Sequence, residues 1–321
     1  MFNPRRSSVL VIALFVLFFL SVLALSLGYH MQGSLKLTSR YLDRFSSFCL
    51  AQGVLVSLED ILAQDKEKND YYCLDQQWKD EFMLNGMPRI LQARDTGFNA
   101  AGKYKVSVID EESKLNINKA DKDILTNFLK IFQPRNAEEL AQNIIDYRQS
   151  REGLKEFYSV YELLNIKGLE QKTFFGEDTN ENKELDPVED DGSLRLPEDN
   201  QNGVLDLGLK DFLTVHSEGK ININTAPPEV LASIPGMNED YARILVDLRK
   251  SKPFKSIDEL KGIIVIPEKV IVQILRFATV QSNNFKIFVT AYHDDKQISR
   301  EILAIVDRSH DKPKIVYWRQ N

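Results

Sequence analysis

The sequence has little of what metal clusters, disulfide scaffolds and nucleic-acid-coating proteins require. Its 321 residues include two cysteines and four histidines, which excludes a four-cysteine zinc site and a disulfide framework. The formal net charge is −6, the wrong sign for a protein that coats nucleic acid. The sequence also lacks G-x-S-x-G, a phosphate-binding glycine loop and an H-x-x-x-H pair. We therefore expect no catalytic residues and no enzymatic activity.

Charge is missing from one N-terminal stretch, residues 9–28. A helix of that length crosses about 30 Å of hydrocarbon. Arg5 and Arg6 precede the stretch, and the positive-inside rule then predicts a cytoplasmic leader at residues 1–8. Signal peptides have apolar regions of about 7–15 residues, shorter than this one. We predict a retained single-pass anchor in a membrane, with the bulk of the chain on the other side.

Proline is missing as well, between Pro4 and Pro88. Apolar residues continue beyond the anchor at helical spacing as far as Leu62. This pattern predicts one helix of roughly 50 residues or more, apolar on all sides in its first half and amphipathic in its second. A basic leader, a membrane span and a continuing amphipathic helix are typical of type IV pilins and pseudopilins, which the sequence resembles.

The resemblance has two departures near the N-terminus. Pilin leaders usually end in glycine at the peptidase site, where this chain has Ser7 and Ser8, the candidates for leader processing. Most pilins also carry a glutamate five residues into the mature chain, which pairs in the bilayer with the terminal amine of the preceding subunit. Apolar residues, Ile12 and Ala13 among them, occupy that region here. A subunit without a predecessor needs no such glutamate, so its absence favours a first-assembled, tip subunit, although an ordinary membrane anchor would lack it too.

A helical module of about 55 residues occurs twice in the sequence. We place repeat 1 at residues 114–171 and repeat 2 at residues 220–276. Three matched segments follow one another in the same order in both copies. They are Lys114–Leu125 with Lys220–Leu231, Asp146–Ser150 with Asp247–Ser251, and Phe157–Leu163 with Phe254–Leu260. The first pair contains N-I-N, which suits a turn fixed by side-chain-to-backbone hydrogen bonds.

Repeat 2 contains I-P-G-M-N at Ile234–Asn238 and resembles the helix-hairpin-helix (SAM-like) module. Such modules often bind DNA through the backbone N–H groups of a glycine hairpin. The alternative function is therefore a membrane-anchored DNA-binding receptor of competence type. Asn238 replaces the second hairpin glycine, and repeat 1 shows no such hairpin. Repeat 1 carries nine basic and nine acidic residues, and repeat 2 carries nine basic and seven acidic residues. Phosphate binding requires clustered cations instead. We expect no nucleic-acid partner.

Gly176–Asp211, which lies between the two repeats, is strongly acidic, with 12 acidic and three basic residues. Oxygen-bearing residues alternate through it as in two EF-hand-like loops. The predicted ligands of one or two Ca²⁺ ions are Asp178, Asn180, Asn182, Glu184, Asp186 and Glu189 in the first loop, and Glu198, Asn200, Asn202, Val204, Asp206 and Asp211 around the second. Lys183 stands where glycine would ease the first turn, and Leu209 where the second loop would have its bidentate glutamate. A solvated acidic linker is the alternative.

Four segments alternate or are rich in β-branched residues and predict strands. They are Gly102–Asp110, Phe285–His293, Ser299–Asp307 and Lys314–Trp318. We therefore predict an α+β fold, in which the long helix packs on an antiparallel sheet and a helical domain is inserted within the sheet. In this prediction the stalk helix and first strand occupy 29–113, the inserted domain 114–284, and the last strands 285–321.

The arrangement is similar to minor pseudopilin K of the type II (general) secretion pathway, the GspK family. The motifs that carry the resemblance are D-E-x-x-K-L-N-I-N at Asp110–Asn118, K-I-N-I-N-T-A at Lys220–Ala226, and the terminal V-Y-W-R. The resemblance implies a bacterial inner-membrane protein with a periplasmic head, placed at the pseudopilus tip with minor pseudopilins I and J above the major pseudopilin filament. It also implies calcium in the helical insertion. An insertion this large leaves little room for a subunit above it.

Cys49 and Cys73 leave two alternatives open. In an oxidising periplasm they form one disulfide that ties the helix to the following loop, or they remain two free thiols.

Calcium binding by Gly176–Asp211 is directly testable. Calorimetric titration with millimolar Ca²⁺ should release or absorb heat, and the segment should become resistant to protease, because the ion offsets repulsion between the carboxylates. An absence of heat together with unchanged protease sensitivity of this segment would mean that it is an acidic linker.

Overall fold

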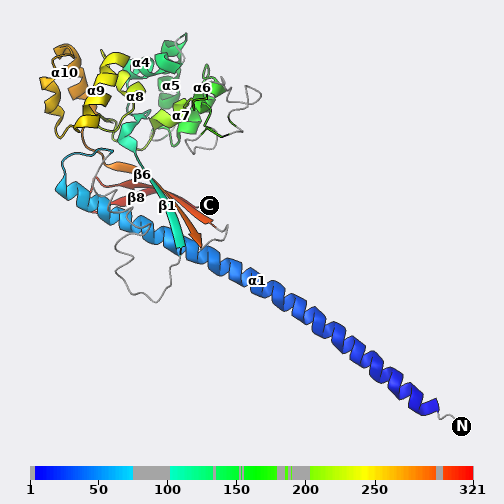
Figure 1. The fold of residues 1–321 in the computed structure, drawn as a ribbon. Helices are drawn as coiled ribbons and strands as arrows, with labels where there is room; N and C mark the ends of the chain where they lie inside the picture. The colour runs from blue at the N-terminus through cyan, green and yellow to red at the C-terminus, as the bar shows by residue number, and fades with distance from the viewer. Residues whose placement is uncertain are drawn as a thin grey trace.

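The computed structural model describes residues 4–74, 102–132, 135–151, 153, 155–178, 185–186, 189, 203–293 and 299–320. One long helix carries a small sheet and, beyond the sheet, a cluster of short helices (Figure 1). The elements that build the head are β1 (Gly102–Asp110), η2 (Glu111–Ser113), β6 (Asn284–His293), β7 (Ser299–Asp307) and β8 (Lys314–Gln320). The helical insertion lies on the side of the sheet away from the long helix (Figure 1).

Helix α1 (Pro4–Lys68) is continuous over 65 residues, which confirms the long helix predicted from the missing prolines. At 1.5 Å per residue it is about 98 Å long. Its C-terminal third has one buried face, and the buried residues recur every three or four positions, as a 3.6-residue period requires. They include Ser47, Ala51, Val54, Leu58, Leu62 and Asp65.

The sheet has four antiparallel strands in the order β1-β6-β7-β8. Residues alternate in burial along β6, where Phe285, Ile287 and Val289 are fully buried against α1. The intervening residues face the helical insertion, and on β7 this second face includes the buried Leu303 and Ile305. The sheet is thus covered by α1 on one face and in part by the insertion on the other. Each of the four strands begins and ends within two residues of the segment predicted for it.

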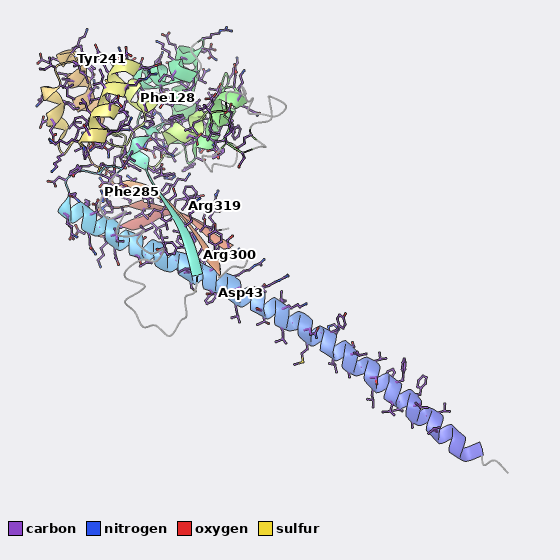
Figure 2. The ribbon with its side chains drawn as sticks, viewed as in Figure 1. Asp43, Phe128, Tyr241, Phe285, Arg300 and Arg319 are labelled. Carbon is purple, nitrogen blue, oxygen red and sulfur yellow. The ribbon has the colours of Figure 1, made fainter. Side chains whose placement is uncertain are left out.

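The insertion contains two helical modules, each closed by a two-residue parallel strand pair. In the first module β2 (Leu115–Asn116) pairs with β3 (Leu213–Thr214), and in the second β4 (Ile221–Asn222) pairs with β5 (Ala278–Thr279). The helices between them share one hydrophobic core, centred on residues such as Phe128 (Figure 2). They are α4 (Lys122–Phe132), α5 (Ala137–Ser150), η3 (Val160–Asn165), α6 (Gln171–Phe175) and α7 (Leu209–Phe212), then α8 (Pro228–Ala232), α9 (Glu239–Ser251), η4 (Ile257–Gly262) and α10 (Glu268–Phe277).

The strand pairs correct the predicted position of the acidic segment. Because β3 follows α7 and closes the first module, the acidic segment lies inside that module and not between the two. In the second module the corresponding place is the uninterrupted α10, so α6 and α7 are two pieces of one helix split by an insertion. A backbone bridge between Gly176 and Leu207 brings the pieces together. A Cβ at Gly176 or Gly208 would lie about 2.2–2.3 Å from backbone atoms of the other strand, so the crossing requires glycine at both positions.

A buried ion pair fixes the end of α1 to the sheet. Nη1 of Arg308 lies 2.9 Å from Oδ2 of Asp65, with the two side chains 3% and 4% exposed. The guanidinium also donates to the carbonyls of Leu62 and Ser282 and lies 4.8 Å over the Phe285 ring. Asp65 Oδ1 in turn accepts from the Asn69 amide at 3.0 Å. Such additional hydrogen bonds are the condition under which a buried ion pair is tolerated.

Removing one partner of this pair should destabilise the head strongly. Asp65→Ala leaves the Arg308 charge buried without its carboxylate, and we expect a loss of about 3–5 kcal/mol in the free energy of unfolding. The exposed pair of Arg243 and Glu239 (68% exposed each) supplies the control, because Arg243→Ala should cost less than about 1 kcal/mol. Urea unfolding of the full chain in detergent measures both, and equal losses would contradict the assignment.

Candidate functional site

Each module is held in shape by the asparagines of its N-I-N motif. In the first module the Asn116 Oδ1 accepts from the backbone N–H of Asn118 at 2.8 Å. The amide of Asn118 reaches across to Phe157, donating to its carbonyl at 2.9 Å and accepting from its N–H at 2.7 Å. An asparagine that donates and accepts at once acts as a short strand partner, so the motif joins the start of the module to the segment before η3.

The second module repeats these contacts with almost the same distances. Asn222 Oδ1 accepts from the N–H of Asn224 at 2.9 Å, and Asn224 donates to the carbonyl of Phe254 at 2.8 Å and accepts from its N–H at 2.9 Å. The predicted turn chemistry of N-I-N is thereby confirmed in both modules.

One arginine in each module holds the carbonyls that follow the motif. Arg148 Nη1 donates to Ile117 and Asn118 at 2.9 Å, and Arg249 Nη1 donates to Ile223 and Ala226 at 2.6 Å. Burial lowers the pKa of Arg249 to about 10 and lowers that of Arg148. These two arginines belong to the matched D-Y-R-Q-S and D-L-R-K-S segments, and their contacts are structural, so they are not available to bind a phosphate.

Both modules contain a glycine hairpin, which corrects the expectation that repeat 1 has none. Gly236 (φ +83°) lies between α8 and α9, whereas Gly168 (φ +95°) lies between η3 and α6. In each hairpin a backbone hydrogen bond spans the glycine. The Ile234 carbonyl accepts from the N–H of Met237, and the Ile166 carbonyl accepts from the N–H of Leu169. The two hairpins occupy different places in their modules, and the place of Gly168 is taken in the second module by Val265.

The junction between sheet and insertion is built around the buried carboxylate of Asp110, the last residue of β1. Thr225 and Ser282 donate their hydroxyls to Oδ2 at 2.5 and 2.6 Å, and the N–H of Glu112 donates to Oδ1 at 2.9 Å. Asn222 Nδ2 lies 3.3 Å from the same Oδ2 and also donates to the carbonyl of Tyr72. The Asp110 side chain thus joins the sheet to the second module, and Asn222 extends this network to the segment after α1.

Two further carboxylates follow directly and are also buried. Glu112 accepts from the N–H and the side-chain amide of Asn284 at 3.0 and 2.9 Å. Glu111 accepts a hydrogen bond from the Thr214 hydroxyl in β3 and lies 3.7 Å from Lys114 Nζ. Burial raises the pKa of both Asp110 and Glu112, and the neighbouring Asp110 charge raises that of Glu112 further. Together these residues attach both modules to the sheet.

The N-terminal half of α1 presents an apolar surface on all sides (Figure 2). It is the one helix among the described residues long and apolar enough to cross a membrane. The exposed apolar surface continues past the span as a second region, the apolar strip, before the sheet begins to cover the helix. The strip consists of Leu35, Leu37, Tyr41, Leu42 and Phe45, which are 58–66% exposed. Exposed apolar area of this extent marks a site of association.

The predicted calcium ligands are only partly within the described residues. Asn180, Asn182, Glu184, Glu198, Asn200 and Asn202 lie outside them. Of the others, Asp178 and Glu189 are buried, while Asp186, Val204 and Asp206 are more accessible. Burial raises the pKa of Asp211, the adjacent Lys210 lowers it, and the Asp178 charge, which is close enough to act on Asp211, raises it. Within the described part of the chain, no three His, Cys, Asp or Glu side chains form a metal-binding group.

The structure has no disulfide between Cys49 and Cys73, and the geometry of α1 argues against that alternative. Cys49 lies on α1 about 19 residues before the helix ends, roughly 28 Å along its axis. The five residues from Lys68 to Cys73 span at most about 18 Å, so Cys73 cannot reach back while the helix is intact. Ser7 and Ser8 lie in the first turns of α1.

Comparison with known proteins agrees with this architecture. A family model described as "Helix-hairpin-helix motif" matches the chain twice, at residues 110–175 and 216–279. The two matches confirm that the insertion contains a duplicated helix-hairpin-helix module. Both matches include the N-I-N motif and its partner segment, and the first ends where α6 does, before the acidic segment.

Among solved structures, the chain is similar to the GspK-GspI-GspJ complex of the type 2 secretion system from enterotoxigenic Escherichia coli. The TM-score is 0.53 at 14% sequence identity, and the match covers 91% of this chain and 99% of the other. At that identity the likeness concerns the fold, and the predicted α+β, pilin-like fold with a large helical insertion is confirmed. No curated protein matches the sequence.

The buried carboxylates predict a pH-dependent stability. A folded-state pKa above the unfolded value means that the folded chain binds the proton more tightly, so the free energy of unfolding should fall as pH rises above about 4.5, the ordinary value for Glu112. Glu112→Gln removes the titrating carboxyl at this position and should therefore flatten the fall of the free energy of unfolding between pH 5 and 8. Glu239→Gln, at an exposed position, should not. Parallel curves for wild type and Glu112→Gln in urea titrations would contradict the assignment.

Proposed function

We propose that this protein is a non-enzymatic minor pseudopilin at the tip of a type II secretion pseudopilus. In this role it helps to initiate filament assembly and thereby the export of proteins across the outer membrane. Its proposed location is the bacterial inner membrane, crossed once by α1, with the N-terminus in the cytoplasm and the head in the periplasm. The proposed partners are minor pseudopilins I and J of the same system and the major pseudopilin filament below them.

The position of the insertion carries this proposal. It lies at the end of the molecule farthest from the N-terminus of α1, beyond the sheet (Figure 1). Pilin-like subunits stack with their long helices side by side, and a subunit within the filament needs the space above its head for the next one. A helical domain fixed in that space through Asp110 and Glu112 fits a terminal subunit and obstructs an internal one.

Two features of α1 support the same role. The stretch predicted to cross the membrane carries no carboxylate in its first turns, and a carboxylate there would otherwise require a partner charge. Past the span, the apolar strip would be exposed to water in an isolated subunit. Helices of neighbouring pseudopilins can cover both regions, which would remove the strip from water on assembly.

We also propose that Ca²⁺ holds the acidic segment in a fixed loop within the first module. The donors are carboxylate and amide oxygens, the ligands Ca²⁺ prefers. Asp178 and Asp211 lie near one another, with Asp178 fully buried, and a cation between such carboxylates would offset their repulsion. The ion would act here as a structural ligand that completes the split helix of α6 and α7.

Co-purification with minor pseudopilins I and J tests the assembly role. The full chain, expressed with both partners and extracted in detergent, should elute with them as one complex. Leu42→Asp places a charge in the apolar strip and should lower recovery of the complex by roughly tenfold or more, because about 1.4 kcal/mol of lost contact energy gives that factor. Arg40→Asp, at an exposed polar position on the opposite face of the same helix, is the control and should have little effect.

The same preparation separates this role from DNA binding. A receptor for DNA should shift duplex DNA in a gel, with an affinity that falls steeply as salt is raised. Such a shift, together with no recovery of pseudopilins I and J, would overturn the proposed function.

A further inference from the structure

The turn between η4 and α10 exposes aliphatic side chains to water. Its sequence is G-I-I-V-I-P at Gly262–Pro267, and we call this segment the apolar turn. Ile266 is buried, and Ile263 packs on the core of the insertion. Ile264 and Val265 instead project outward and are 98% and 65% exposed. The value for Ile264 is the highest among the large apolar side chains of the described residues.

The first module shows that the fold does not require apolar residues at these two positions. In the apolar turn the N–H of Ile266 donates to the carbonyl of Ile263 at 3.4 Å, and the same bond at the same distance closes the corresponding turn of the first module. The two exposed positions of that turn hold Lys167 and Gly168. Adjacent exposed apolar side chains that folding does not require indicate a site of association.

The apolar turn lies far from the membrane that α1 is predicted to cross. It leads directly into α10, which lies at the end of the molecule farthest from the N-terminus of α1 (Figure 1). The predicted span ends at Gly28, and α1 continues to Lys68, about 60 Å further along the helix axis. The apolar turn therefore does not reach that bilayer while α1 is straight, and any partner approaches it from the opposite end.

The small size of the exposed pair decides between a protein and a lipid partner. A stable protein interface takes about 800 Å² from each side, and two aliphatic side chains supply a small part of that area. Exposed charged residues surround them in the sequence, namely Asp258, Glu259 and Lys261 before the turn and Glu268 and Lys269 after it. A lipid surface needs no matching contour, because it admits apolar side chains to a depth of about 5–10 Å while their charged neighbours stay at the headgroups.

We propose that the apolar turn binds a second lipid surface, one that α1 does not cross, by inserting Ile264 and Val265 among the acyl chains. The flanking residues are three acidic and two basic, so no excess of positive charge draws the turn to anionic lipid. Binding rests on apolar contact and is therefore insensitive to salt. This site is separate from the apolar strip, and it does not depend on the proposed place in a secretion filament.

Flotation with vesicles tests the lipid contact. The full chain is reconstituted in nanodiscs, which occupy α1, and is then mixed with phosphatidylcholine vesicles and centrifuged through a density gradient. Nanodiscs that carry the chain should float with the vesicles to the same extent at low and at high salt, and empty nanodiscs should not float. A chain that stays at the bottom of the gradient, or that floats only at low salt, would overturn the proposal.

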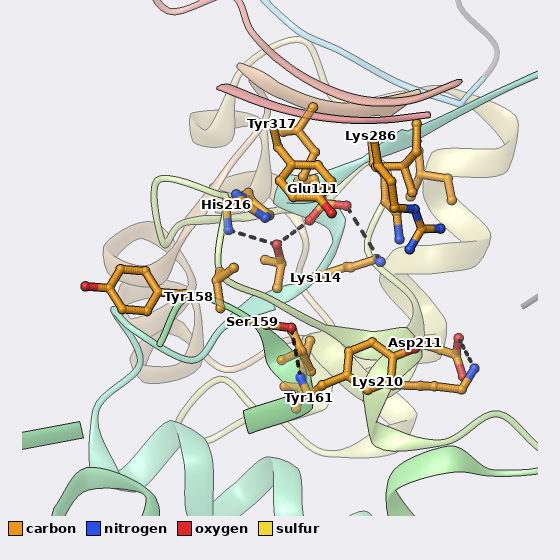
Figure 3. Close-up of a pocket in the computed structure, with 18 of the residues that line it drawn as sticks. Glu111, Lys114, Tyr158, Ser159, Tyr161, Lys210, Asp211, His216, Lys286 and Tyr317 are labelled. Carbon is orange, nitrogen blue, oxygen red and sulfur yellow. Dashed lines mark hydrogen bonds and ion pairs between the residues drawn. The ribbon is translucent and has the colours of Figure 1, made fainter. Parts of the chain in front are cut away.

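The two modules supply matched variants. Ile264→Lys combined with Val265→Gly introduces the residues of the first module and should lower the bound-to-free ratio by roughly tenfold or more. The control is Tyr158→Lys, which introduces Lys255 of the second module at a position that is 66% exposed. Tyr158 lines a cavity of about 320 Å³ between the sheet and the insertion (Figure 3), so this variant should float as the wild type does. Equal losses in both variants would contradict the assignment.

Two further measurements test insertion itself. Vesicles with brominated acyl chains should quench the tryptophan fluorescence of Ile264→Trp more than that of the wild type, whose tryptophans are Trp78 and Trp318. Equal quenching would mean that the turn stays outside the hydrocarbon and would overturn the proposal. Sedimentation of the full chain in detergent tests the other occupant. A dimer that the double variant at Ile264 and Val265 dissociates would show that a second copy of this chain covers the turn, and would overturn the lipid surface.

Discussion

The buried carboxylate of Asp110 is the contact on which the rest of the head depends. It ends the first strand of the sheet and accepts hydrogen bonds from Thr225 in the second module and from Ser282 just before β6. The carbonyl of Ser282 in turn accepts from Arg308, whose guanidinium is paired with Asp65 on α1. A continuous buried polar path therefore joins the long helix, the sheet and the insertion. Because an unsatisfied member would be costly in a dry interior, the path fixes the orientation of the insertion relative to α1.

Duplication explains the insertion, and the differences between the copies show where it has specialised. Both modules keep the same asparagine and arginine contacts, which hold the module in shape. Two of their differences concern the last helix and the turn before it. The last helix of the first module is split by the acidic segment, whereas α10 is continuous. The second-module counterparts of Lys167 and Gly168 are Ile264 and Val265, which are 98% and 65% exposed. The shared contacts maintain the fold, and the divergent places are free to acquire binding roles.

Local patterns in the sequence predicted much of the fold. The long helix followed from apolar spacing and missing proline, the strands from alternation, and the duplicated module from matched segments. The junction could not be predicted in this way, because Ser282 is 172 residues from Asp110 and no local pattern links them. The hairpin at Gly168 was missed because it occupies a different place in its module. The matching position of repeat 2 is Val265, so comparing the two copies does not reveal it. The disulfide alternative does not fit because the helix places Cys49 too far from its own end for Cys73 to reach back.

The central claim is that the insertion caps a filament. Its most direct test is to label the insertion of the full chain with a gold-conjugated antibody fragment and to image assembled pseudopili by electron microscopy. The account predicts label at one end of each filament, since a fixed domain above the head leaves no space for a further subunit. Label distributed along the length of the filaments would show that the insertion is compatible with internal positions and would contradict the account.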